Sequence, residues 1–196
     1  MADLRDLTGL RRSPLAHLDT VLTGRAVRLR EVPFNVMVSM RVDPDALAAD
    51  RLAGVLGVRL PLRCGGTATG DRGTAIWLGP DEWLVVAGDD DAAARLGSDL
   101  TAALGGDHGS VVDVSANRTT LELTGPAARD VLEKGCALDL HPRSFEPGQA
   151  VSSTVGPVPV VLWQVDDVTY RLLPRASFAD YLARWLLDAM SEYGAA

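Results

Sequence analysis

The chain has 196 residues, of which 47% are hydrophobic and 23% are charged, and its formal net charge is −7. This composition is typical of a globular protein that can bury a substantial core, and no apolar run approaches the roughly 20 residues that a membrane-spanning helix needs. The acidic balance and the scattered arginines disfavour nucleic acid as a partner, because a phosphate backbone would be repelled.

The first predicted unit is an N-terminal arm over residues 1–26. Its stretch MADLRDLTGLRRSPLAHL alternates charges with leucines, and it lacks the apolar core and the small-residue cleavage site of a secretory signal. Cys64 and Cys136 lie far apart in sequence, so they form neither a disulfide framework nor a zinc spacing. We therefore expect a cytoplasmic protein with two reduced thiols and no membrane segment.

Residues 27–116 are predicted to form a first α+β half. Apolar residues with period 2 predict strands, and those with period 3.6 predict helices. The expected elements are a strand over Arg25 to Val42, a helix that Asp43 caps and Gly57 ends, a flexible glycine-rich loop over Arg63 to Gly73, a hairpin that turns at residues 79–81, and a helix over about Asp91 to Leu104.

Residues 117–196 are predicted to form a second, similar half. The strands VVDVS and RTTLELTG flank the boundary at Ala116 and Asn117. The later elements are a helix that opens at Pro126 and closes at a left-handed Gly135, the strands AVSSTV, PVPVVLWQV and VTYRLLP, and a last helix that Ser177 caps and whose apolar stripe runs from Phe178 to Ala189. Both halves contain a Trp-bearing strand, an acidic turn, a further strand and an amphipathic helix. The fold class predicted is α+β, with two similar halves of antiparallel sheet packed with helices.

The stretch LEKGCALDLHPRSF contains the strongest candidate for a catalytic group. Cys136 could act as a nucleophile, with His141 as base and Asp139 to orient it. Catalytic partners are usually assembled by the fold and not by proximity in sequence, however, and lone cysteines are common core residues. A position just past a helix C-terminus also disfavours a thiolate. The structural interpretation is therefore favoured.

Other chemical candidates are also better explained by structure. His17, His108 and His141 have no metal-ligand spacing, and GGTATG lacks the ending of a phosphate-binding P-loop. The acidic groups Asp81–Glu82, Asp89–Asp91 and Asp166–Asp167 lie at expected turns or helix starts, and most of the four tryptophans are expected in the core. The sequence thus predicts no catalytic, cofactor-binding or metal-binding residue in this chain.

The run VVDVSANRTTLELTGPAARDVLEKGCALDL resembles the D-x-S segment of the folate-binding aminomethyltransferase superfamily, the group of the glycine-cleavage T-protein. Within that superfamily, RSPLAHL, LGPDEWLV, LEKGCALDLHPRSF and VTYRLLPRASFADYLARWLLDA resemble gamma subunits of heterotetrameric sarcosine oxidase. These segments occur in order and span most of the chain. The resemblance implies a fold like the folate-binding domain of the T-protein.

The resemblance also implies a function. Such a cytoplasmic complex oxidatively demethylates sarcosine to glycine, with hydrogen peroxide and a one-carbon unit that tetrahydrofolate can accept. In that family the alpha and beta subunits hold FAD, FMN and NAD, and the delta subunit binds zinc. The chain is then expected to be a non-catalytic gamma subunit that supports assembly with the alpha, beta and delta subunits.

Departures from the catalytic relatives favour that non-catalytic role. T-proteins follow D-x-S with His, whereas Asp113, Val114 and Ser115 are followed here by Ala116. Their catalytic acid lies in a glycine-rich strand that ends in Asp-Asp, but the matching strand here reads GPVPVVLWQ. KGC also resembles a motif of a folate-binding iron-sulfur maintenance family, without the Gly-Gln or Gly-Glu that should follow it. The alternatives are a stand-alone folate-binding or aminomethyl-transferring protein, and a paralogue that serves another N-methyl amine dehydrogenase.

Overall fold

The computed structural model describes residues 11–18, 22–23, 26–88 and 90–194. Its strands are β1 (Leu22–Thr23), β2 (Arg28–Val32), β3 (Val36–Val42), β4 (Thr67–Gly70), β5 (Gly73–Gly79), β6 (Glu82–Ala87), β7 (Gly109–Asp113), β8 (Thr120–Thr124), β9 (Ala150–Val155), β10 (Val158–Gln164) and β11 (Thr169–Pro174). Its helices are α1 (Leu47–Leu56), α2 (Asp91–Ala94), α3 (Leu96–Leu104), α4 (Ala128–Glu133) and α5 (Ala179–Gly194), with a 3-10 helix at Ala176–Phe178.

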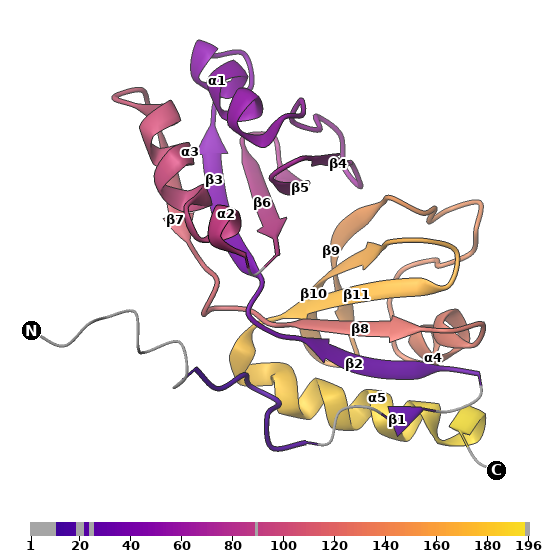
Figure 1. Cartoon of the computed structure of the whole chain (residues 1–196). Coiled ribbons are helices and arrows are strands. Elements are labelled where there is room, and N and C mark those ends of the chain that lie inside the picture. The colour runs from indigo at the N-terminus through magenta and orange to yellow at the C-terminus, as the bar shows by residue number, and fades with distance from the viewer. Residues whose placement is uncertain (1–10, 19–21, 24–25, 89, 195–196) are drawn as a thin grey trace, which may run out of the picture.

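The strands form two sheets, and each sheet carries helices on one face (Figure 1). The six-stranded sheet has the order β1-β2-β8-β11-β10-β9, and the five-stranded sheet has the order β4-β5-β6-β3-β7. Every pairing is antiparallel. The predicted fold class, antiparallel sheets packed with helices in an α+β fold, is confirmed.

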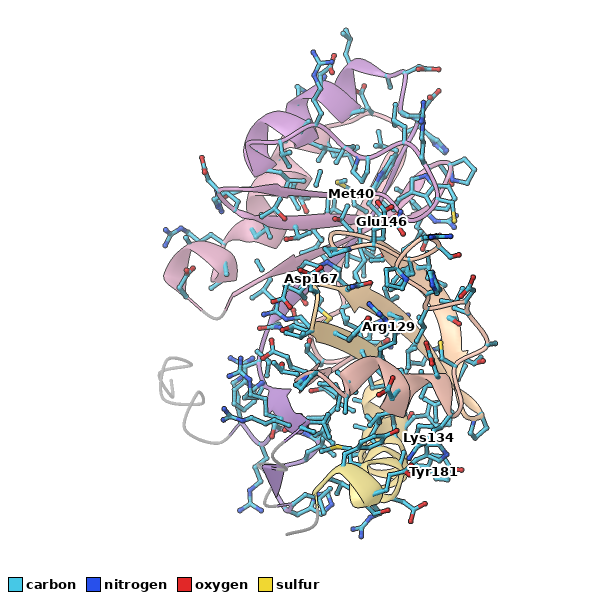
Figure 2. The ribbon with its side chains drawn as sticks, turned by 90° about the vertical axis from the view of Figure 1, so that its right-hand side faces the viewer. Met40, Arg129, Lys134, Glu146, Asp167 and Tyr181 are labelled. Atoms are coloured by element: carbon cyan, nitrogen blue, oxygen red, sulfur yellow. The ribbon has the colours of Figure 1, made fainter. Side chains whose placement is uncertain are left out.

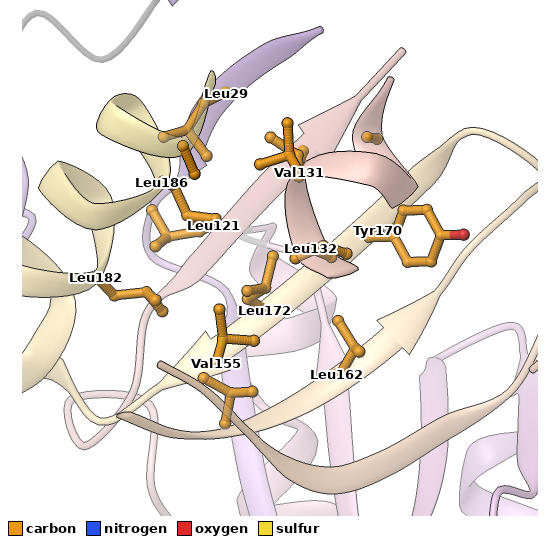
Figure 3. Packing of buried hydrophobic residues seen from close by; sticks show 14 of the residues in the cluster. Leu29, Leu121, Val131, Leu132, Val155, Leu162, Tyr170, Leu172, Leu182 and Leu186 are labelled. Carbon is orange, nitrogen blue, oxygen red and sulfur yellow. The ribbon is translucent and has the colours of Figure 1, made fainter. Parts of the chain in front are cut away.

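The six-stranded sheet buries one face beneath α4 and α5 (Figure 3). Alternate residues of its strands, among them Leu121 and Leu172, point toward Val131 on α4 and Leu182 and Leu186 on α5, and all five side chains are fully buried. Burying a leucine or valine side chain stabilises the fold by about 1.5–3 kcal/mol relative to leaving it exposed. The apolar face of the sheet therefore holds both helices in place.

The five-stranded sheet has a core of its own beneath α1 and α3. Leu52 of α1 and Leu100 of α3 pack against Val38, Met40 and Val85 of the central strands. The opposite face of this sheet meets the six-stranded sheet through a third cluster of buried residues. That cluster consists of Met37, Ile76, Leu84, Val86, Ala150, Val161, Trp163 and Leu173. Two sheets back to back thus form the centre of the molecule, and the helices lie outside them.

One predicted strand is wrong because the chain changes sheets within it. Arg25 to Val42 was expected to form a single strand, but β2 pairs with β8 in the six-stranded sheet and β3 pairs with β6 and β7 in the other. The two strands are separated by Pro33, which has no amide to donate, and by Phe34, whose φ of 63° turns the chain sharply. Residues 27–116 therefore do not contribute to one sheet alone, and the division at residue 116 stays a prediction.

Several predicted boundaries also differ. The expected flexible loop over Arg63 to Gly73 contains strand β4, which pairs with β5. The expected helix from Asp91 to Leu104 is interrupted at Arg95. Asp43 does not cap α1, which begins at Leu47 with Ala46 before it and no side-chain cap. Gly57 does end that helix in the left-handed conformation, with φ 72°.

The last helix is also entered differently from the prediction. Ser177 lies inside the 3-10 helix instead of capping α5. The predicted apolar stripe is buried at Leu182, Leu186 and Ala189, but Phe178 and Tyr181 at its start are 42% and 52% exposed. Within the described residues, no helix is long and apolar enough to cross a membrane.

Candidate functional site

A large hollow lies where the chain passes between the two sheets. It has a volume of about 920 Å³, and it is bordered by the connection from β2 to β3 and the connection from β7 to β8. Its lining consists of Arg11, Arg12, Pro14, Phe34, Asp113, Val114, Ser115, Ala116, Asn117, Arg118 and Thr119. The D-x-S motif that resembles the T-protein segment therefore lines this hollow.

The side chains of the D-x-S motif hold the local backbone. Asp113 Oδ1 accepts hydrogen bonds from the Ser115 amide at 2.8 Å and from Ser115 Oγ at 2.6 Å. Ser115 Oγ in turn accepts from the amide of Met37 on β3, at 3.0 Å, and the Val114 amide donates to the Met37 carbonyl. This network ties the end of β7 to β3, so the Asp113 carboxylate is engaged in a turn at the point where the chain leaves the first sheet.

The N-terminal segment closes one side of the hollow. Leu15 is fully buried in the core under α5, and the Glu31 carboxylate accepts hydrogen bonds from Ser13 Oγ at 2.6 Å and Thr119 Oγ1 at 2.7 Å. The Arg11 guanidinium lies 4.5 Å from the centroid of the Phe34 ring. Residues 11–18 are therefore packed against the six-stranded sheet and its core, while residues 1–10 of the predicted arm lie outside the described residues.

A partly buried arginine, Arg118, lines the hollow between the two sheets. Arg118 is partly buried, and its Nη1 donates to the carbonyl of Leu173 at 2.8 Å. Burial, followed by the charge of Arg175, lowers the pKa of Arg118 below its usual value. The hollow thus has a desolvated cation on one wall, and among its described lining residues the carboxylate is that of the hydrogen-bonded Asp113.

The three residues of the proposed Cys–His–Asp set do not assemble as a nucleophilic site. Asp139 accepts from the backbone amide of His141 at 3.0 Å and from Ser144 Oγ at 2.6 Å, and these two bonds, Ser144 first, lower the pKa of that carboxyl. The His141 ring accepts from the Arg143 amide at 3.2 Å through Nδ1. Cys136 forms a backbone bridge with Val155. Asp139 and His141 therefore stabilise a surface turn through local backbone contacts.

The KGC tripeptide, which follows α4, instead contacts α5 through the side chain of Lys134. Lys134 Nζ donates to the Ala189 carbonyl, pairs with the Glu192 carboxylate and lies 4.8 Å from the centroid of the Tyr193 ring. Figure 2 shows Lys134 where α4 approaches α5. The prediction of a left-handed Gly135 is wrong, because its φ is not positive.

Gly135 is small for a steric reason. A Cβ at this position would lie 2.5 Å from Trp185 Cζ2 and 2.7 Å from its Cη2. The Gly135 carbonyl also accepts from the amide of Gly156 at 2.9 Å, and a Cβ on Gly156 would lie 3.4 Å from Trp185 Nε1. The indole of α5 therefore rests on two glycines that are hydrogen-bonded to each other.

The remaining candidates lie apart from one another. His17 Nε2 pairs with Asp180 Oδ1 at 2.7 Å, His108 lines a small pocket beside β7, and His141 lies in the turn described above. No group of three or more potential metal ligands occurs in the part of the chain that the structure describes. Cys64 is an exposed free thiol beside the GGTATG stretch, most of which forms β4.

Acidic residues and tryptophans mostly take the predicted structural roles. Asp90 Oδ1 accepts from the Ala93 amide at the start of α2, and Asp166 Oδ1 accepts from the Val168 amide in the hairpin turn. Trp83 and Trp163 are buried, which confirms the core prediction for them, whereas Trp77 and Trp185 are half-buried.

Sequence reasoning missed a charged cluster on the inner face of the six-stranded sheet. Glu122 is 6% exposed, and its carboxylate accepts from Arg30 Nε at 2.7 Å and from Arg171 Nε at 3.0 Å. Arg171 in turn lies 5.2 Å from the Trp163 ring centroid. The register places Arg30 and Arg171 directly opposite Glu122. The sequence feature that could have indicated this cluster is Glu122, an acid at the centre of the apolar strand TLELT. The sequence does not reveal, however, which strands lie on either side of this strand.

Comparison with known proteins identifies a matching family model and several relatives that are similar in sequence. A family model described as "Sarcosine oxidase, gamma subunit family" matches residues 41–192. The sarcosine oxidase subunit gamma of Arthrobacter sp is 44% identical over 195 residues, which are 97% of this chain and 95% of the relative. The corresponding subunit of Corynebacterium sp. (strain U-96) is 45% identical over 198 residues, with the same shares of the two chains.

Comparison with solved structures identifies proteins with a similar fold. A chain in the heterotetrameric sarcosine oxidase from Corynebacterium sp. U-96, in complex with pyrrole 2-carboxylate, matches with a TM-score of 0.88 and 44% identity, covering 95% of this chain and 98% of that chain. The glycine cleavage system aminomethyltransferase T from Bartonella henselae matches with a TM-score of 0.65 and 18% identity, covering 87% of this chain and 47% of that chain. The second likeness shows a shared fold, as the D-x-S resemblance predicted.

Proposed function

The chain belongs to the sarcosine oxidase gamma subunit family, and from that membership we propose that it is the gamma subunit of a heterotetrameric sarcosine oxidase, which oxidatively demethylates sarcosine to glycine. The observation that carries the proposal is the match to a chain of such a complex over nearly the full length of both proteins. A large insertion or deletion in either chain would lower the covered share, so the two chains have the same segments available for contact with other subunits.

The proposed role is non-catalytic support of assembly. Asp113, the acid of the D-x-S motif, is bound to Ser115, and Ala116 follows in place of histidine. Asp139 and His141 are engaged in a local turn. A general base must reach its substrate's proton, whereas the carboxylates of Asp113 and Asp139 each accept hydrogen bonds from their own neighbouring turn.

We propose further that the partners are the alpha, beta and delta subunits, that they carry FAD, FMN, NAD and zinc, and that the complex acts in the cytoplasm. Both cysteines of this chain are free thiols, which fits a reducing compartment.

The test is co-expression of the tagged chain with the other three subunits, followed by affinity purification and size-exclusion chromatography. The proposal expects all four chains to elute together with sarcosine-dependent peroxide production. Elution of this chain alone, while the other three form an active enzyme, would contradict it.

The T-protein fold supports one alternative, a stand-alone folate-binding or aminomethyl-transferring protein. This function needs a carboxylate that faces the pterin, and among the described residues that line the large hollow the carboxylate, Asp113, is hydrogen-bonded to Ser115. Titration of the isolated chain with tetrahydrofolate separates the two functions, since saturable binding at micromolar concentration would favour the alternative.

A further inference from the structure

Two arginines beside the junction of the sheets have no acidic partner in the part of the chain that the structure describes. Arg118 and Arg175 face each other as an isolated backbone bridge, so their side chains start from neighbouring positions. Within the described residues, neither forms an ion pair with a carboxylate.

This arrangement differs from that of six other arginines in the described structure, each of which is paired with an acid. The arginines that form ion pairs with acids are Arg30, Arg41, Arg51, Arg72, Arg171 and Arg184. On a chain with a net charge of −7, two adjacent cations without an acid are costly, all the more because Arg118 is partly buried. Each guanidinium has donors available for an anion.

Arg118 and Arg175 both line a pocket of about 380 Å³. It is lined by Arg118, Ser152, Ser153, Pro159, Val160, Val161, Arg175 and Phe178, none of which is acidic. Ser152 and Ser153 are consecutive in β9, so one of the two hydroxyls can point to the side of the arginines and donate a further hydrogen bond to an oxygen there. The lining therefore suits a carboxylate.

An exposed aromatic surface continues from this pocket. Phe178 lines the pocket and is 42% exposed, and Tyr181, three residues later, is 52% exposed. Residues three apart on a helix share one face. Aromatic residues and arginine are the side chains most enriched in the centres of protein interfaces. A free inorganic anion would satisfy the arginines but would leave both rings in water.

We infer that Arg118, Arg175, Phe178 and Tyr181 form a docking surface for an acidic segment of another subunit. A carboxylate of that segment enters the pocket between the two guanidiniums, and its apolar neighbours cover the two rings. This inference rests on the proposed function, because it assigns one face of the chain to the assembly.

The test uses the whole chain and the other subunits of the complex. Tagged wild-type chain and the Arg175→Glu variant are titrated against the remaining subunits, and the apparent Kd is measured. Arg175 is exposed, and within the described residues its side chain forms no hydrogen bond or ion pair, so this variant should fold normally, which circular dichroism and Tm check. The matched control is Arg59→Glu, an exposed arginine beside α1 on the other half.

Loss of a charge pair at the centre of an interface typically weakens binding by roughly 30-fold or more, and we expect that loss for Arg175→Glu but less than about 3-fold for Arg59→Glu. Phe178→Ala should weaken assembly independently of salt, whereas the effect at Arg175 should shrink as salt is raised.

The possible failures can be told apart. If the wild-type chain does not bind the other subunits, the proposed function fails, and this inference fails with it. If the wild-type chain assembles and Arg175→Glu assembles equally tightly, only the docking surface is overturned. Unchanged assembly, together with phosphate binding to the isolated chain that Arg175→Glu abolishes, would instead identify the pocket as a site for a small anion.

Discussion

Replacing Gly135 by alanine tests how the KGC stretch holds the last helix. The added Cβ would lie 2.5 Å from Trp185 Cζ2, whereas ordinary contacts begin near 3.4 Å, so the indole must shift by roughly 1 Å. Overpacking of this kind typically costs 1–3 kcal/mol. In a chain of this length each kcal/mol corresponds to about 2–4 °C in Tm, so the expected loss is about 2–12 °C.

The assay is urea denaturation of the purified chain, followed by far-UV circular dichroism and tryptophan fluorescence. Gly106→Ala is the matched control, because nothing lies within 4 Å of its added Cβ and its φ is not positive. Trp185→Leu removes the atoms that clash, so Gly135→Ala should cost much less in that background. A cost below about 0.5 kcal/mol in the wild-type background, or the same cost with and without Trp185, would refute the steric explanation.

Three further predictions concern other residues. Glu122→Gln leaves Arg30 and Arg171 without their acid on the sheet face. Because both arginines retain access to water, we expect the free energy of unfolding, measured by urea denaturation, to fall by about 1–3 kcal/mol, which is less than for a fully buried pair. An unchanged free energy of unfolding would contradict a stabilising role. Hydrogen bonds, chiefly from Arg184, lower the pKa of Asp180. The ionised carboxylate therefore stabilises the fold, and this stabilisation is lost as the pH falls through the lowered pKa. The Tm of Asp180→Asn should fall less than that of the wild type between about pH 5 and pH 3, and an equal fall would argue against the contact. Cys136→Ala should leave sarcosine turnover of the assembled complex nearly unchanged, and a loss beyond about a hundredfold with assembly intact would identify a chemical role.

The elements that sequence patterns predicted well are those with local causes. The hairpins β5–β6 and β10–β11 follow from short turns between apolar strands, and the left-handed Gly57 follows from the need to end a helix. The D-x-S turn was visible as a motif, but its hydrogen bond to Met37 was not, because these residues are distant in sequence. The Arg118–Arg175 pair was missed for the same reason.

Residue spacing and short motifs were enough to predict the order of most strands and helices, the α+β class and the resemblance to one family. The tertiary structure alone decided that the chain changes sheets at Phe34, that Glu122 lies between two arginines, and that Gly135 is small because Trp185 rests on it. The physical reason is that each of these features depends on a partner contributed by a remote part of the chain. Periodicity specifies which face of an element is buried, but only packing specifies what that face meets.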